Sequence, residues 1–124
     1  GVTFALRDCL EAARANGMHI ARTKLCGGGA KSPLWRKIVA NVLGMPVDIP
    51  QTEQGPAYGA AMLAMVGCGE YSTVQAAADA VVRVRETVQP DAAVSARYEE
   101  RYAAFRALYP ALKGVFPALA LSGK

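Results

Sequence analysis

A run of three glycines, Gly27 to Gly29, constrains the fold more than any other feature of this sequence. The stretch His19–Cys26 before it is typical of a strand, because its apolar residues gather toward its end. Ser32 and Pro33 follow, a favourable N-cap residue and a residue favoured at the first helical position. A strand, a glycine turn and a helix in this order predict an α/β domain.

The remaining chain alternates helical and extended patterns. Apolar periodicity predicts helices over residues 2–16, 33–43, 55–66, 72–84 and 91–112, and extended segments over residues 19–26, 46–50 and 87–90. Prolines at both ends of residues 46–50 favour an edge strand. This order predicts an α/β fold with a partly parallel, mixed sheet and flanking helices.

Two observations indicate a piece of a longer protein. The chain starts at Gly1 without a methionine, and the helix over residues 2–16 has no Ser, Asp or Asn cap before it. Only two or three strands are visible, which is few for a well-covered sheet. We therefore expect further strands in sequence that precedes Gly1.

Capping residues mark several helix ends. Gly17 and Gly44 are expected to end the first two helices, Gly17 as a left-handed C-cap. The stretch from Ser72 to Gln75 matches a capping box, and Asp91 is expected to cap the last helix.

Two helices carry distinctive side chains. Residues 55–66 are rich in glycine and alanine, which predicts a helix that approaches the sheet or another helix closely. Tyr98, Tyr102 and Phe105 lie on the apolar side of the last helix and are expected in the core, not on a platform for nucleic-acid bases.

Composition excludes several classes of protein. Apolar residues make up 52% of the 124 residues, and the +4 net charge comes from scattered Lys and Arg, so neither a disordered tail nor a nucleic-acid stripe is expected. The longest small and apolar stretch, residues 55–69, is shorter than the roughly 20 residues of a membrane helix. Three widely spaced cysteines form neither a disulfide framework nor a zinc pattern; each is expected to be buried, in a reduced cytoplasmic compartment. No secretory signal opens the chain, so export is not expected.

The glycine segment is the strongest candidate for a ligand site. Glycines leave no side chain between backbone and ligand, and the helix start after them favours anions. The spacing matches neither a P-loop nor a dinucleotide-binding fingerprint. On the pattern alone, a ligand-approach loop and a simple tight turn both stay open.

Other polar residues predict no catalytic centre. His19, the single histidine, has no Ser or Cys placed beside it, and Asp48 and Glu53 flank a turn where solvated side chains are expected. No acid–base pair, metal cluster or nucleophile triad appears in the sequence. We predict no catalytic residue and no metal ligand in this chain.

Three blocks carry a family resemblance. They are GGGAKSPLWR over residues 27–36, GMPV over residues 44–47 and EQGPAYGAA over residues 53–61. In this order and spacing the sequence resembles the C-terminal domain of the FGGY family of carbohydrate kinases, and within it most closely the bacterial xylulose kinases. The opening GVTFALRD also resembles a helix of that family.

The resemblance implies a fold and an activity. FGGY kinases have two actin-like, ribonuclease H-like domains, with ATP mainly on the C-terminal domain and the sugar mainly on the N-terminal one. Residues 1–116 would then be the nucleotide-binding domain, truncated at its N-terminal side, with a flexible tail over residues 117–124. The implied function is the adenosine-binding portion of an ATP-dependent xylulose kinase. The alternatives are the same portion of a glycerol, gluconate or ribulose kinase, or a non-catalytic binding domain.

The resemblance also implies site residues and partners. The family's adenosine motif falls on Gly28, Gly29 and Ala30. Glycerol kinases place a nucleotide-contacting Asn where this chain has Pro33, so Ser32 is the expected substitute. The catalytic aspartate, the phosphate-contacting motifs and the Mg²⁺ ligands are expected upstream of this chain. The expected partners are ATP and a pentulose held through the N-terminal domain, with a homodimer left open.

Overall fold

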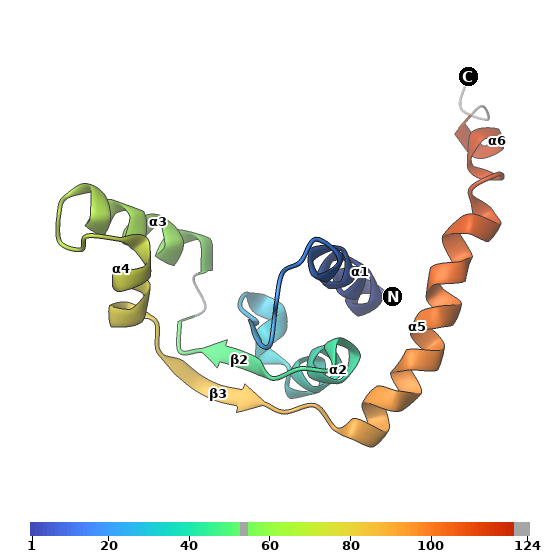
Figure 1. Ribbon diagram of the computed structural model, residues 1–124, viewed down its shortest axis with the longest axis horizontal. Coiled ribbons are helices and arrows are strands. Elements are labelled where there is room, and N and C mark those ends of the chain that lie inside the picture. Colours follow the sequence, from blue (N-terminus) through green and yellow to red (C-terminus); the bar gives the residue numbers. More distant parts are fainter. Residues whose placement is uncertain (53–54, 121–124) are drawn as a thin grey trace.

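The computed structural model describes residues 1–52 and 55–120. It contains the following helices and strands, in chain order: α1 Val2–Ala15, β1 Thr23–Lys24, the 3-10 helix η1 Gly28–Lys31, α2 Pro33–Leu43, β2 Val47–Pro50, α3 Gly55–Gly67, α4 Val74–Val81, β3 Val84–Val88, α5 Ala92–Leu112 and α6 Phe116–Ala120 (Figure 1). Helix α6 forms where the sequence shows no helical pattern, and it covers the first part of residues 117–124. The flexibility of that tail stays a prediction. Within the described ranges, no helix has the combined length and apolar character that crossing a membrane requires.

The strands form a mixed sheet of three strands in the order β1-β2-β3. Strand β2 pairs in parallel with β1 and antiparallel with β3. Its register with β3 shifts between Ile49 and Pro50, and Arg85 has no partner residue opposite it. The mixed α/β architecture predicted from the sequence is confirmed.

The predicted edge position of residues 46–50 is wrong, because β2 is the central strand among those described. Its prolines do not interrupt the ladder: Pro46 precedes the strand, and Pro50 ends it beside the register shift. The other strands also differ from their predicted bounds. Strand β1 covers only Thr23–Lys24, since its parallel partners are two residues of β2, and β3 begins at Val84, where the sequence predicts the end of a helix.

Helix α2 packs against the sheet and forms the core with it. Four buried residues make up this cluster: Val39, Ala40, Val47 and Ile49. Half-buried side chains pack around them: Leu25, Trp35, Leu43 and Val88. The core therefore lies directly beside the glycine segment, which joins β1 to α2.

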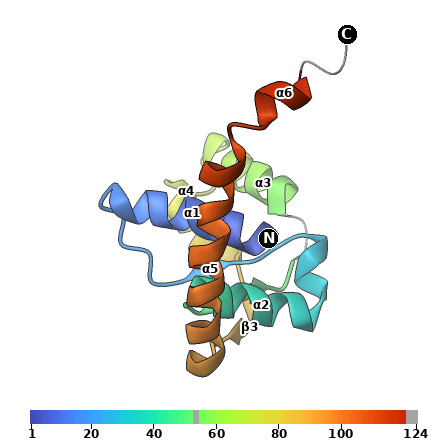
Figure 2. The ribbon, with the colours of Figure 1, turned by 90° about the vertical axis from the view of Figure 1, so that its right-hand side faces the viewer.

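Helix α5 lies across α1 and α2 (Figures 1 and 2). The Phe4 ring of α1 contacts three aromatic rings of α5, with centroids 5.4 to 6.1 Å apart: Tyr98, Tyr102 and Phe105. Arg7 forms two hydrogen bonds to Glu99, of 2.7 and 2.9 Å, and its guanidinium lies over the Tyr102 ring. Of these three aromatic residues, all predicted to lie in the core, Tyr102 is buried at 7% exposed, whereas Tyr98 and Phe105 are half-buried.

The junction of α1 and α5 should make stability depend on pH in the alkaline range. Burial, and next the 2.5 Å hydrogen bond that the Tyr102 hydroxyl donates to Asp8, raise the pKa of Tyr102 from 10.0 to about 12. Above pH 10 the unfolded chain loses this proton while the folded chain retains it, so unfolding is favoured as the pH rises through about 12. We expect the urea midpoint to fall between pH 10 and 12 more steeply for the wild-type chain than for Tyr102→Phe. Equal slopes for the two proteins would contradict this role of Tyr102.

Several predicted caps are confirmed. Ser32 accepts a 3.3 Å hydrogen bond from the Trp35 amide, Gly44 ends α2 with φ 63°, and Asp91 accepts a 3.0 Å bond from the Val94 amide. Gly17 has φ 84° just beyond α1. The predicted capping box from Ser72 to Gln75 is wrong, because the N-cap of α4 is Thr73 and not Ser72. The Gln75 side chain forms a hydrogen bond to Asp79 and does not reach back to the cap.

The predicted close packing of residues 55–66 is found at the start of the helix, where a Cβ on Gly55 would lie 3.0 Å from Sγ of Cys26, but not along the rest of it. Helix α3 has no buried residue, and a Cβ placed on Gly59 would meet no atom within 4 Å. Helix α3 lies beside α4, to which the Tyr58 hydroxyl donates a 2.9 Å hydrogen bond at the Val81 carbonyl. Its small residues therefore leave an open surface in this part of the chain.

Candidate functional site

The glycine segment forms one turn of 3-10 helix between β1 and α2. The Ala30 amide donates to the Gly27 carbonyl at 3.0 Å, and the Ser32 amide donates to the Gly29 carbonyl at 3.2 Å. Pro33 then begins α2, where its missing N–H removes no helical hydrogen bond. The glycine turn predicted between the strand and the helix is therefore a short, regular helical turn.

The three glycines of the segment differ in what a side chain at each position would meet. Gly27 has φ 84° and ψ −178°, a conformation that only glycine adopts without strain. At Gly28 the backbone is exposed and a Cβ would meet nothing within 4 Å. A Cβ on Gly29 would lie 3.1 Å from Nε1 of the Trp35 indole, so a side chain there would crowd the indole unless Trp35 shifted. Positive φ therefore explains Gly27 and neither of its neighbours.

The other predicted site residues do not all face the same way. Ala30 is buried, 8% exposed, and its carbonyl accepts a hydrogen bond from Nε of Arg36. Ser32 and Pro33 are exposed, but the Ser32 oxygen is already engaged as the cap of α2. Four of the five predicted residues are thus accessible at the surface, namely Gly28, Gly29, Ser32 and Pro33, whereas Ala30 faces inward.

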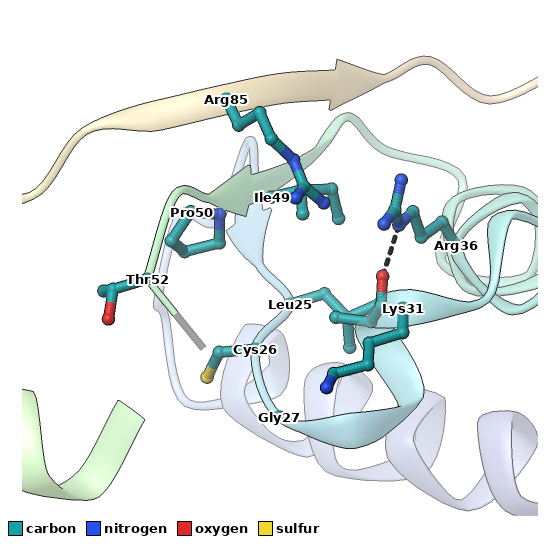
Figure 3. Close-up of a pocket in the computed structure, with 10 residues that line it drawn as sticks. Leu25, Cys26, Gly27, Lys31, Arg36, Ile49, Pro50, Thr52 and Arg85 are labelled. Atoms are coloured by element: carbon teal, nitrogen blue, oxygen red, sulfur yellow. Dashed lines mark hydrogen bonds between the residues drawn. The ribbon is translucent and has the colours of Figure 1, made fainter. Parts of the chain in front are cut away.

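A cavity of about 250 Å³ lies on the inner side of the glycine segment (Figure 3). Its walls come from the end of β1 and the segment itself, from α2, from β2 with the residues after it, and from β3. Small and apolar groups form part of the lining, among them Leu25, Ala30 and Ile49. Three cationic residues also line it, Lys31 from the glycine segment, Arg36 from α2 and Arg85 from β3.

Neither of these two arginines was predicted from the sequence to be a site residue. Arg36 belongs to the family-like block of residues 27–36, so its position in that block could have indicated it. Arg85 comes from β3, 55 residues after Ala30, and only the pairing of β2 with β3 brings it to the cavity.

Other residues singled out from the sequence lie elsewhere. His19 is exposed, and Glu53 lies outside the described residues. Asp48 is not solvated as predicted: it is 5% exposed on the central strand, where its Oδ1 accepts bonds from Arg22 at 3.0 Å and from the Thr87 hydroxyl at 2.7 Å. All three cysteines are exposed, so their predicted burial is wrong; Cys26 borders the cavity. In residues 1–52 and 55–120, no group of three or more His, Cys, Asp or Glu side chains is arranged to hold a metal ion.

Comparison with known proteins identifies the family. Residues 1–68 match the model of the C-terminal domain of the FGGY family of carbohydrate kinases. The chain belongs to this family. The match includes all of α2, β2 and α3, and with them the glycine segment.

Relatives of this FGGY chain are similar along most of its length. A xylulose kinase of Staphylococcus epidermidis is 31% identical over 91% of this chain, and an L-xylulose/3-keto-L-gulonate kinase of Escherichia coli is 30% identical over 92%. The crystal structure of a xylulose kinase from Rhodospirillum rubrum aligns with 93% of the chain at a TM-score of 0.77 and 33% identity. The mixed sheet with its flanking helices is therefore part of the actin-like fold of FGGY kinases. The chain spans 23% of the length of each of these three proteins.

Proposed function

We propose that this chain is the adenosine-binding portion of an ATP-dependent xylulose kinase, which converts D-xylulose and ATP to D-xylulose 5-phosphate and ADP. The observation that carries this proposal is the exposed backbone at Gly28, between a strand and a helix, in a chain that belongs to a family of kinases. Relatives named as xylulose kinases support the choice of sugar.

The residues present fit an adenosine group. A ligand could lie against the backbone at Gly28, because no atom of the described residues occupies the space where a side chain would stand. Gly29 and Pro33 would border this contact on the exposed surface, and Ser32 could donate its hydroxyl proton while its oxygen caps α2. Ala30 would contribute from the inner side, through the cavity wall that it forms.

The catalytic step would depend on the rest of the protein. Phosphoryl transfer needs an oriented nucleophile, a base and metal ions that bridge the phosphates. Mg²⁺ would supply charge stabilisation, and we place its ligands, the catalytic aspartate and the sugar pocket outside this chain. This chain's own contribution would be to bind and orient the nucleotide.

A second substrate is supported by one specific observation. The Escherichia coli relative is named for L-xylulose and 3-keto-L-gulonate and is nearly as similar to this chain as the Staphylococcus epidermidis protein. The alternative function is therefore the same phosphoryl transfer to another sugar or sugar acid.

Turnover by the full-length protein tests the proposal. Formation of ADP should be measured against a panel of pentuloses, polyols and sugar acids, with D-xylulose expected to give the highest kcat/KM. A higher value for L-xylulose or 3-keto-L-gulonate would favour the alternative, and no sugar-dependent ADP formation would refute a kinase. Residues 1–124 alone are the control and should show no turnover, since none of the groups that phosphoryl transfer requires is proposed to lie within them.

A further inference from the structure

The cavity inside the glycine segment is positively charged. No Asp or Glu of the described residues lines it, whereas the cationic side chains of Lys31, Arg36 and Arg85 all do. A cavity with this lining attracts anions. The question is which of these cations is available to a ligand.

Arg36 is already neutralised. Its Nη1 forms a 2.7 Å ion pair with Glu86, and its Nε donates to the Ala30 carbonyl. These bonds hold the guanidinium as part of the cavity wall. Binding an anion at Arg36 alone would therefore compete with Glu86.

Arg85 is different, because no carboxylate of the described residues pairs with it. Figure 3 shows its side chain reaching from β3 into the cavity, toward the space beside Arg36. Its five N–H donors form a planar fork suited to the oxygens of a phosphate. Arg85 is thus the cation whose hydrogen bonds a ligand could complete.

The sheet itself directs Arg85 into the cavity. Glu86 lies opposite Ile49 and Val84 lies opposite Pro50, so Arg85 is the extra residue where the register shifts. Consecutive strand residues normally point to opposite faces, and a bulge changes the direction of one of them. Here Arg85 lines the same cavity as Arg36, the residue that Glu86 neutralises.

The size of the cavity limits its occupant. Its volume is about 250 Å³, and the cavity is partly open to solvent. This volume accommodates a phosphate group with a few waters and is small for a whole nucleotide. The remainder of a bound nucleotide would lie outside, along the exposed glycine backbone.

We propose that Arg85 is an anion-binding residue of the nucleotide site and that the cavity takes a phosphate group of the bound nucleotide. The inference rests on the proposed function, because it assumes that a nucleotide lies on the glycine segment. It adds a binding residue from β3, outside the residues 1–68 that match the family model.

Binding of three ligands to the full-length protein tests the role of Arg85. Titration calorimetry with ATP, ADP and adenosine should be compared for the wild type, Arg85→Ala and Arg85→Lys. We expect Arg85→Ala to weaken ATP and ADP about tenfold, the effect of one lost charge-assisted hydrogen bond, and to leave adenosine unchanged. Arg85→Lys should retain part of the affinity, since it keeps the charge and loses the planar fork.

The control is Arg101→Ala, which removes the same charge from an exposed position on α5 that does not line the cavity, and it should change no affinity. Melting temperatures of all variants should match the wild type, because Arg85 is exposed and holds no partner among the described residues. Equal weakening of adenosine and ADP would overturn the phosphate assignment in favour of a contact to the base or ribose. Unchanged ATP and ADP affinities would overturn the role of Arg85 altogether. Failure of the wild type to bind either adenosine or ATP would instead refute the proposed function.

Discussion

Replacing Ile49 by alanine should lower the free energy of unfolding of this chain by about 3–4 kcal/mol, within the range for buried Ile→Ala substitutions. Ile49 is 2% exposed and belongs to the four-residue cluster between α2 and the sheet. Because this core is small, little other packing compensates for a cavity at its centre. Urea unfolding measures the change directly.

Leu63→Ala is the matched control for this substitution. It also shortens a large aliphatic side chain, but Leu63 is 61% exposed on α3, so its effect should stay within about 0.5 kcal/mol. An equal loss in the two variants would mean that the cluster around Ile49 does not dominate the stability of the chain.

Valine at Gly28 should raise the KM for ATP of the full-length kinase about tenfold or more, which is a loss of about 1.4 kcal/mol of binding or greater. The new side chain would occupy the space that we assign to the ligand, while no described atom lies within 4 Å of its Cβ. The melting temperature and the KM for the sugar should therefore stay close to the wild-type values.

Valine at Gly29 is the matched comparison, one residue along the same segment. Its Cβ would lie 3.1 Å from the Trp35 indole, which packs against the core, so this variant should have a lower melting temperature. Kinetics with ATP and thermal melting of both variants separate the ligand contact from the packing contact. A Gly28→Val variant with unaltered ATP kinetics would refute the adenosine site and leave the segment as a connector.

Local interactions made part of this structure predictable from the sequence. Ser32, Gly44 and Asp91 act on backbone groups within a few residues of themselves, so their types and positions were sufficient to place helix ends. The glycine segment between a strand and α2 was recognised for the same reason, and the spacing of its neighbouring blocks indicated the family. The helices up to α5 were also predicted from patterns within their own sequences, whereas α6 forms where the sequence shows no helical pattern.

Contacts between distant residues required the tertiary structure. The central position of β2 depends on β3 pairing beside it, and the register shift that directs Arg85 into the cavity exists only in that pairing. A side chain at Gly29 would crowd the Trp35 indole, which only the folded chain places there. The pKa of Tyr102 is raised by its burial and by its hydrogen bond to Asp8, 94 residues away. A sequence specifies the types of these residues, but pairing register, burial and side-chain contacts are decided by which distant segments pack together.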